Sequence, residues 1–300
     1  RAEHASLARP AAIKLIRGDA LGGAPEERAT AVRRFEQEAR DTALLRSEHT
    51  ITIYDFGRAA DDSFYYVMEL LDGIDLQGLV ERFGALPPAR VVPILRQACH
   101  SLAEAHERGL VHRDIKPANI YLCRHGLDVD FVKVLDFGLV KHTATGPAAD
   151  PRLTQEGQIS GTPTYLAPEL ATGDGGVDRR ADIYALGCVA YWLLAGRTVF
   201  AADTAMKQIL AHVAETPAPP SRFAPVPPAL EDLVLRCLAK KPEDRPATAQ
   251  ALDAELAAVK LEEPWAEDAA RAWWDGNLPG ATKPVESADS LAATMPIGTG

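Results

Sequence analysis

The dominant spacing of apolar residues changes near Gly73, and this change limits the folds that the chain can adopt. Before Gly73, short apolar runs at 9–16, 51–59 and 63–70 are bounded by polar or turn-forming residues, which is typical of β-strands. Residues 31–45 differ, because their apolar positions are three or four residues apart and predict a helix. We therefore expect the region before Gly73 to form strands and one helix.

After Gly73 the helical spacing of three and four residues dominates. The first such segment begins at Pro87 and Pro88 and is expected to end near Gly109, because glycine commonly terminates a helix. The later elements predicted by the same patterns are a short strand at 131–135 and helices at roughly 179–195, 203–215, 228–239 and 248–260.

Together these patterns predict a bilobal α+β fold with a cleft between the lobes. A small β-rich lobe is expected at about 1–70 and a mainly helical lobe at about 73–260. The tail, 261–300, ends in small polar residues that are typical of a linker. Three tryptophans earlier in the tail predict either a short helix packed on the large lobe or a docking site for a partner; they are Trp265, Trp273 and Trp274.

Charge and composition argue against several classes of protein. With 32 basic and 42 acidic residues, the net charge of −10 argues against nucleic-acid binding, which favours a basic excess. The longest apolar run, 185–196, is shorter than the roughly 20 residues that cross a bilayer, so it predicts a buried helix. The four cysteines lack metal-binding spacing, and we expect free thiols in the cytoplasm, with any membrane tether beyond residue 300.

The segment HRDIKPAN, 112–119, places a carboxylate, an amine and an amide close together in Asp114, Lys116 and Asn119. A lone aspartate usually caps a helix or remains a solvated charge, but this segment is one of several motifs in a fixed order. The others are AAIK ending at Lys14, RFEQEA containing Glu38, DFG at 136–138, APE at 167–169 and DIYALG at 182–187.

In this order the motifs resemble those of the eukaryotic-like (Hanks-type) protein kinases, over residues 1 to about 260. The resemblance implies transfer of the γ-phosphoryl group of ATP, which needs positioning and charge compensation more than covalent help. Asp114 would orient the acceptor hydroxyl and accept its proton, and Lys116 would contact the γ-phosphate. Asn119 and Asp136 would supply oxygen ligands to magnesium.

The same resemblance assigns residues to the nucleotide. Lys14 would hold the α- and β-phosphates with Glu38 paired to it, although Glu38 could instead pair with Arg34 at helical spacing. Met68 is either a core methionine or the residue beside adenine. The other adenine contacts would come from the backbone of Glu69 and Leu71 and from the side chains of Ala12 and Tyr121. Tyr121 is larger than the residue usual in the family.

Other motif residues are expected to support the site. By resemblance, His112 would brace the loop and Phe137, and Asp182 would anchor the loop from the helix beneath it. Glu169 and Arg245 would form a buried ion pair with a structural role.

Regulation and specificity are read from the segment between DFG and APE. Arg113 is either a surface charge or the partner of a phosphate on this segment, and Thr154 resembles the autophosphorylated threonine of bacterial relatives. Thr162 and Lys116 together form the serine/threonine pattern, and KPANI resembles the bacterial branch of the family. The resemblance thus implies protein substrates and a kinase–kinase dimer during autophosphorylation.

The resemblance is incomplete before Lys14. Kinases cover the phosphates with a glycine-rich strand–turn–strand, and we expect residues 1–10 to be its second strand, with the first strand and the glycine loop absent. Such a fragment should bind ATP weakly. Two alternatives stay open: a pseudokinase serving as a binding module, and a small-molecule phosphotransferase. The filled lysine, aspartate and asparagine positions argue against the first, and GTPTYLAPE, 161–169, argues against the second.

Overall fold

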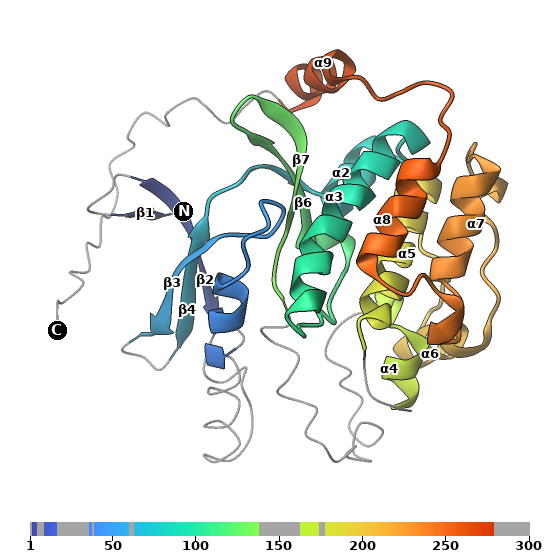
Figure 1. Ribbon diagram of the computed structural model, residues 1–300, viewed down its shortest axis with the longest axis horizontal. Coiled ribbons are helices and arrows are strands. Elements are labelled where there is room, and N and C mark those ends of the chain that lie inside the picture. Colours follow the sequence, from blue (N-terminus) through green and yellow to red (C-terminus); the bar gives the residue numbers. More distant parts are fainter. Residues whose placement is uncertain are drawn as a thin grey trace.

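The structure is a computed structural model that describes residues 2–4, 9–16, 36–37, 39–59, 63–137, 163–173 and 178–278. Figure 1 shows a smaller part built from strands beside a larger part built mainly from helices, and the predicted α+β arrangement is confirmed. The strands are β1 (Ala2–His4), β2 (Arg9–Ile16), β3 (Ile53–Arg58), β4 (Phe64–Glu69), β5 (Asp72–Asp75), β6 (Ile120–His125) and β7 (Asp128–Val134). The labelled helices are α2 (Leu76–Phe83), α3 (Pro88–Glu107), α4 (Pro168–Thr172), α5 (Arg180–Ala195), α6 (Ala205–Ala214), α7 (Pro228–Cys237), α8 (Ala249–Ala258) and α9 (Glu267–Asn277).

The smaller part contains an antiparallel sheet in the order β1-β2-β4-β3 (Figure 1). Side chains of β4 alternate between two faces, and Phe64 and Tyr66 are buried on one of them against Ala39. Ala39 belongs to the helical residues 39–43, which are part of the helix predicted at 31–45. The predicted pairing of the segments that contain β3 and β4 is also confirmed.

A second antiparallel sheet, β5-β6-β7, joins the two parts of the molecule. The apolar pattern predicts only a strand at 131–135, and the observed β7 begins earlier, at Asp128. β5 has the sequence DGID, which carries no apolar alternation, so its sequence contains no strand signal. Its pairing with β6 requires Gly73, because a Cβ there would lie 2.1 Å from the carbonyl oxygen of Leu122.

The helical part is organised around α5, which is buried on almost all sides. The long apolar run at 185–196 covers most of this helix, so the prediction of a buried core helix is confirmed. α3 packs against α5, α8 and β7. α3 begins with Pro88 in its first turn, and Gly109, with φ 76°, follows its last residues as predicted. The chain leaving α3 therefore turns directly into the HRDIKPAN segment.

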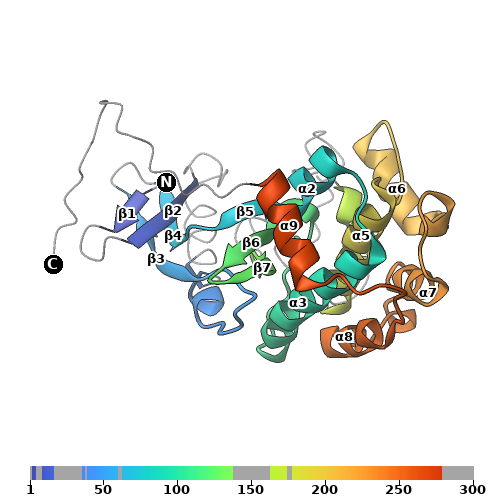
Figure 2. The ribbon, with the colours of Figure 1, turned by 90° about the horizontal axis from the view of Figure 1, so that it is seen from above.

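The tail helix α9 lies beside the β6–β7 hairpin in both Figure 1 and Figure 2. Trp274 is fully buried there, and Trp273 packs on the large core. This arrangement corresponds to the predicted packed helix, except that Trp265 precedes the helix. Among the residues that the structure describes, no helix is long and apolar enough to span a membrane.

Candidate active site

The buried carboxylate of Asp182 holds the loop that carries the HRDIKPAN segment. From the first turn of α5 it accepts the backbone N–H groups of His112 and Arg113, both at 2.7 Å. His106 of α3 contacts the same carboxylate at 2.8 Å. Hydrogen bonds to an ionised acceptor are stronger than those between neutral groups. The loop backbone is therefore tied to the central helix, which is the contact expected of an anchoring Asp182.

The structure brings together the three polar groups that the sequence places at 114, 116 and 119. Lys116 Nζ donates to Asp114 Oδ2 at 2.9 Å. Asn119 Nδ2 donates to the same oxygen at 3.0 Å and to the Asp114 carbonyl oxygen at 2.9 Å. These two side-chain donors orient the Asp114 carboxylate. Because Asp114 is only partly buried, the carboxylate also borders a cavity.

Asp136 and Asn119 have the oxygen chemistry that magnesium requires. The backbone N–H of Leu135 donates to the Asn119 carbonyl oxygen at 2.8 Å, which joins the loop to the DFG segment. Because the Asn119 NH₂ group faces Asp114, its side-chain oxygen is the atom left to bind a cation. No cluster of three His, Cys, Asp or Glu side chains could hold a metal within the described ranges. Magnesium is usually bound through one or two carboxylates plus substrate phosphates.

Lys14, on β2, reaches the carboxylate of Asp136. Its Nζ lies 2.5 Å from Asp136 Oδ2, and the hydroxyl of Tyr66 donates to Asp136 Oδ1. A cation from the small lobe thus meets the carboxylate expected to bind metal. The predicted partner of Lys14, Glu38, lies outside the described residues, and that pair stays a prediction.

The residues predicted around adenine lie at the junction of the two sheets. Ala12 and Met68 are register partners on β2 and β4. The Glu69 backbone N–H donates to the Thr52 carbonyl oxygen at 3.0 Å, so only its carbonyl could serve a nucleotide. Leu71 lies between β4 and β5, and Tyr121 lies on β6. The Tyr121 hydroxyl donates to the Gly73 carbonyl oxygen at 3.2 Å.

His112 is a neutral buried residue that links the loop to Phe137. Its Nε2 donates to the Leu135 carbonyl oxygen at 2.8 Å, and its Nδ1 accepts the Asp114 N–H at 3.3 Å. This pattern needs one protonated nitrogen and one free nitrogen. Burial lowers the pKa of His112, which favours the neutral ring. The centroids of the His112 and Phe137 rings are 4.5 Å apart, which is the contact expected of a bracing residue.

Glu169 and Arg245 form the expected ion pair. Two parallel hydrogen bonds of 2.7 and 2.8 Å join the Arg245 guanidinium to the Glu169 carboxylate. Arg245 also donates to the backbone carbonyl oxygens of Arg180, Ala239 and Lys240. The pair therefore fastens α4, which begins at Pro168 within the APE motif, to the helical lobe.

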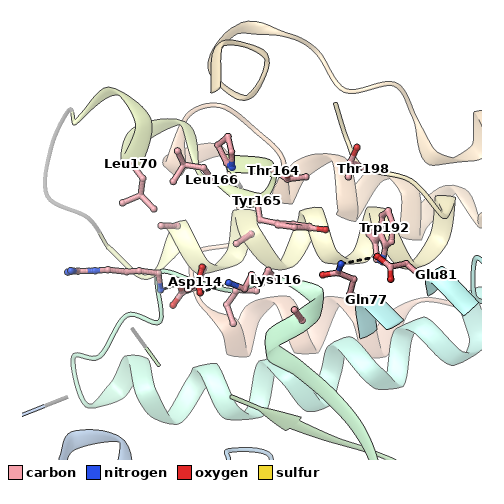
Figure 3. A pocket seen from close by; sticks show the side chains of 17 residues that line it. Gln77, Glu81, Asp114, Lys116, Thr164, Tyr165, Leu166, Leu170, Trp192 and Thr198 are labelled. Atoms are coloured by element: carbon pink, nitrogen blue, oxygen red, sulfur yellow. Dashed lines mark hydrogen bonds and ion pairs between the residues drawn. The ribbon is translucent and has the colours of Figure 1, made fainter. Parts of the chain in front are cut away.

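A cavity of about 520 Å³ lies beside Asp114 and Lys116. Figure 3 shows Tyr165, Leu166 and Leu170 across the cavity from these two residues. The lining also includes polar side chains, among them Gln77 and Glu81. A cavity that combines apolar and polar side chains in this way can hold a segment of a substrate.

Two predicted residues, Thr154 and Thr162, lie outside the described residues together with Glu38. Tyr66 and Asp130 make buried contacts that sequence reasoning does not identify. For Tyr66 a signal exists, because it occupies an inward-facing strand position yet carries a hydroxyl. For Asp130, which is buried against Arg90, no local pattern predicts burial.

Residues 2–257 match the sequence model of a family described as "Protein kinase domain". Serine/threonine-protein kinase pkn3 of Myxococcus xanthus is 39% identical over 304 residues, which cover 99% of this chain and 54% of that protein. Serine/threonine-protein kinase PknB of Mycolicibacterium smegmatis is 37% identical over 298 residues, covering 97% of this chain and 45% of that protein. The chain thus spans about half the length of these curated relatives.

Solved structures have the same fold. A crystal structure of a double mutant of the PknI kinase domain from Mycobacterium tuberculosis has a TM-score of 0.63 and 28% sequence identity, and the match covers 85% of this chain and 87% of that one. Rad53, solved in complex with AMP-PNP, has a TM-score of 0.62 at 24% identity and covers 84% of this chain and 59% of that one. At that identity the second likeness concerns the fold alone.

Proposed function

The chain belongs to the protein kinase family, and we propose that it transfers the γ-phosphoryl group of ATP to serine and threonine hydroxyls of proteins. The observation that carries this proposal is the arrangement at Asp114, whose carboxylate is held by Lys116 and Asn119 at 2.9 and 3.0 Å. A binding module has no need of a carboxylate oriented in this way beside a cavity.

The chain's own residues position the reacting groups. Asp114 accepts the proton of the substrate hydroxyl as that oxygen bonds to the γ-phosphorus, and the bond from phosphorus to the leaving ADP oxygen breaks. Lys116, already beside Asp114, offers its ammonium group to the transferred phosphoryl group. Lys14, whose Nζ lies 2.5 Å from Asp136 Oδ2, would hold the nucleotide phosphates. Asn119 and Asp136 would hold magnesium, which would compensate the phosphate charge when bound.

The test compares Asp114→Asn with Asp128→Asn in the full-length protein. Both variants replace a carboxylate by an amide, but Asp128 is exposed at the start of β7. Loss of the proton acceptor should lower phosphoryl transfer to a protein substrate by about 10²- to 10⁴-fold. Magnesium–ADP binding should stay near wild type, because Asp114 contacts the acceptor. Near wild-type transfer by Asp114→Asn contradicts its role, and a wild-type protein that binds nucleotide without transfer favours the pseudokinase.

Regulation by autophosphorylation forms a finer part of the proposal. Arg113 precedes Asp114 in the anchored loop, so a phosphate that binds its guanidinium would act next to the site of transfer. We assign that phosphate chiefly to Thr154, transferred between two copies of the kinase. The four cysteines are buried and unbridged, which supports a cytoplasmic location for this domain.

A further inference from the structure

Tyr66 carries a hydroxyl at a position where packing requires only an aromatic ring. It lies on β4 with 1% of its surface exposed, and it shares its face with Phe64. Ala39 completes the buried part of this cluster, with Met68 packed at its edge. A phenylalanine would serve these contacts equally well. A buried hydroxyl needs a hydrogen-bond partner, so its presence calls for a separate explanation.

The partner of this hydroxyl is a carboxylate from the other side of the cleft. Tyr66 Oη donates to Asp136 Oδ1, whereas Lys14 Nζ lies 2.5 Å from Asp136 Oδ2. Lys14 and Tyr66 are register partners on β2 and β4, and the Lys14 Nζ lies 5.8 Å from the centroid of the Tyr66 ring. Two neighbouring residues of one sheet therefore contact the two oxygens of one carboxylate.

In this contact the Tyr66 hydroxyl is the donor and the carboxylate oxygen of Asp136 is the acceptor.

We propose that Tyr66 is a positioning residue, whose hydroxyl orients the Asp136 carboxylate for magnesium binding. The inference rests on the proposed function, because it takes Asp136 as a metal ligand. A carboxylate offers about four lone-pair directions, so two donors leave positions for a cation. Without the hydroxyl, the carboxylate keeps Lys14 on one oxygen and can rotate about its last bond. Binding of magnesium would then have to restrict that rotation.

The size of the effect follows from other metal sites. Loss of a hydrogen-bond partner behind a metal ligand typically lowers metal affinity about 10- to 100-fold. The opposite outcome has an equally clear physical basis, because a hydroxyl that competes with the cation for Oδ1 would weaken metal binding. Removal of such a competitor would strengthen it. A fall in magnesium affinity without the hydroxyl therefore indicates an orienting role, and a rise indicates competition with the cation.

The experiment measures ADP binding by calorimetry, with magnesium and with excess chelator, for wild type, Tyr66→Phe and Tyr65→Phe. Tyr65→Phe is the matched control, because it removes a hydroxyl from the next residue of β4, on the opposite face. Tyr65 pairs in register with Leu15 and Gly57, and its ring lies over Gly57. The readout is the ratio of ADP affinities with and without the metal, which a general loss of stability would leave unchanged.

We expect Tyr66→Phe to lower this ratio about tenfold or more, with little change in metal-free ADP affinity. Tyr65→Phe should match wild type. A ratio in Tyr66→Phe equal to or above that of wild type overturns the proposal. Wild-type protein with no magnesium dependence of ADP binding overturns the proposed metal ligands as well. Asp114→Asn keeps the two proposals separate, because loss of transfer in that variant supports the kinase function whatever Tyr66→Phe does.

Discussion

Replacement of Trp274 by phenylalanine should destabilise the fold well beyond the usual effect of a smaller ring. Trp274 on α9 is fully buried, and its indole Nε1 donates to Asp130 Oδ1 at 2.6 Å. Trp265 donates to the other oxygen of Asp130 at 2.7 Å, and Arg90 donates to both oxygens at 2.7 and 2.9 Å. The Arg90 guanidinium carbon also lies 3.9 Å from the centroid of the Trp273 ring. The tail thus completes the environment of a buried ion pair.

The expected magnitude has two parts. Loss of a hydrogen bond to a charged group costs roughly 1.5–3 kcal/mol. The volume lost from indole to benzene leaves a small cavity, which costs about 1 kcal/mol more. The free energy of unfolding should therefore fall by about 3 kcal/mol. At roughly 2 °C per kcal/mol for a chain of this size, the melting temperature should fall by about 6 °C.

The assay is urea unfolding together with thermal melting, and the matched control is Trp192→Phe. Trp192 lies partly buried on α5, and its indole N–H has no hydrogen-bond partner among the described residues. The control should therefore cost only about 1 kcal/mol, the volume term alone. Equal losses of unfolding free energy in the two variants would show that the hydrogen bond from Trp274 to Asp130 does not stabilise the fold. A chain ending at residue 260 that melts like the full chain would show that the tail is separate from the fold, as the predicted boundary at about 260 implies.

Three further predictions concern stability and regulation. Arg245→Ala should lower the free energy of unfolding by about 3–5 kcal/mol, because Glu169 loses its buried partner; a loss below about 1 kcal/mol contradicts this. Burial lowers the pKa of His212 from 6.5 to about 4, so the unfolded state binds the proton more readily and stability falls as the pH drops from 6.5 toward 4. The loss of stability between pH 7 and pH 4.5 should be about 2 kcal/mol smaller in His212→Gln than in wild type. An equal loss in the variant and in wild type would show that protonation of His212 does not cause the decrease. The control is His100→Gln, which replaces an exposed histidine. Mass spectrometry of the active full-length protein should find phosphate on Thr154, and Thr154→Ala should lower its activity; an unmodified Thr154 in fully active protein removes this mechanism.

Local sequence patterns predicted the parts of the fold in which neighbours along the chain determine the structure. The apolar run of α5 and the spacing within α3, α7 and α8 predicted helices whose observed ends differ by about two residues or fewer. The trio at Asp114, Lys116 and Asn119 was also predictable, because residues so close along the chain share one loop. β5 and α2 were not predictable in this way, because β5 is short and polar and the signal in α2 is brief.

The contacts of Asp136 and Asp130 were decided only by the tertiary structure. Asp136 is contacted by Tyr66, 70 residues away along the chain, and Asp130 by Trp274, 144 residues away. An aspartate in a sequence reads as a solvated charge, because burial of a carboxylate is unfavourable without donors. Those donors come from distant strands and from the tail, and they reach the carboxylates only after the sheets, α3 and α9 have packed. The sequence by itself therefore determined the long helices and the catalytic loop, whereas folding decided which buried charges acquire partners.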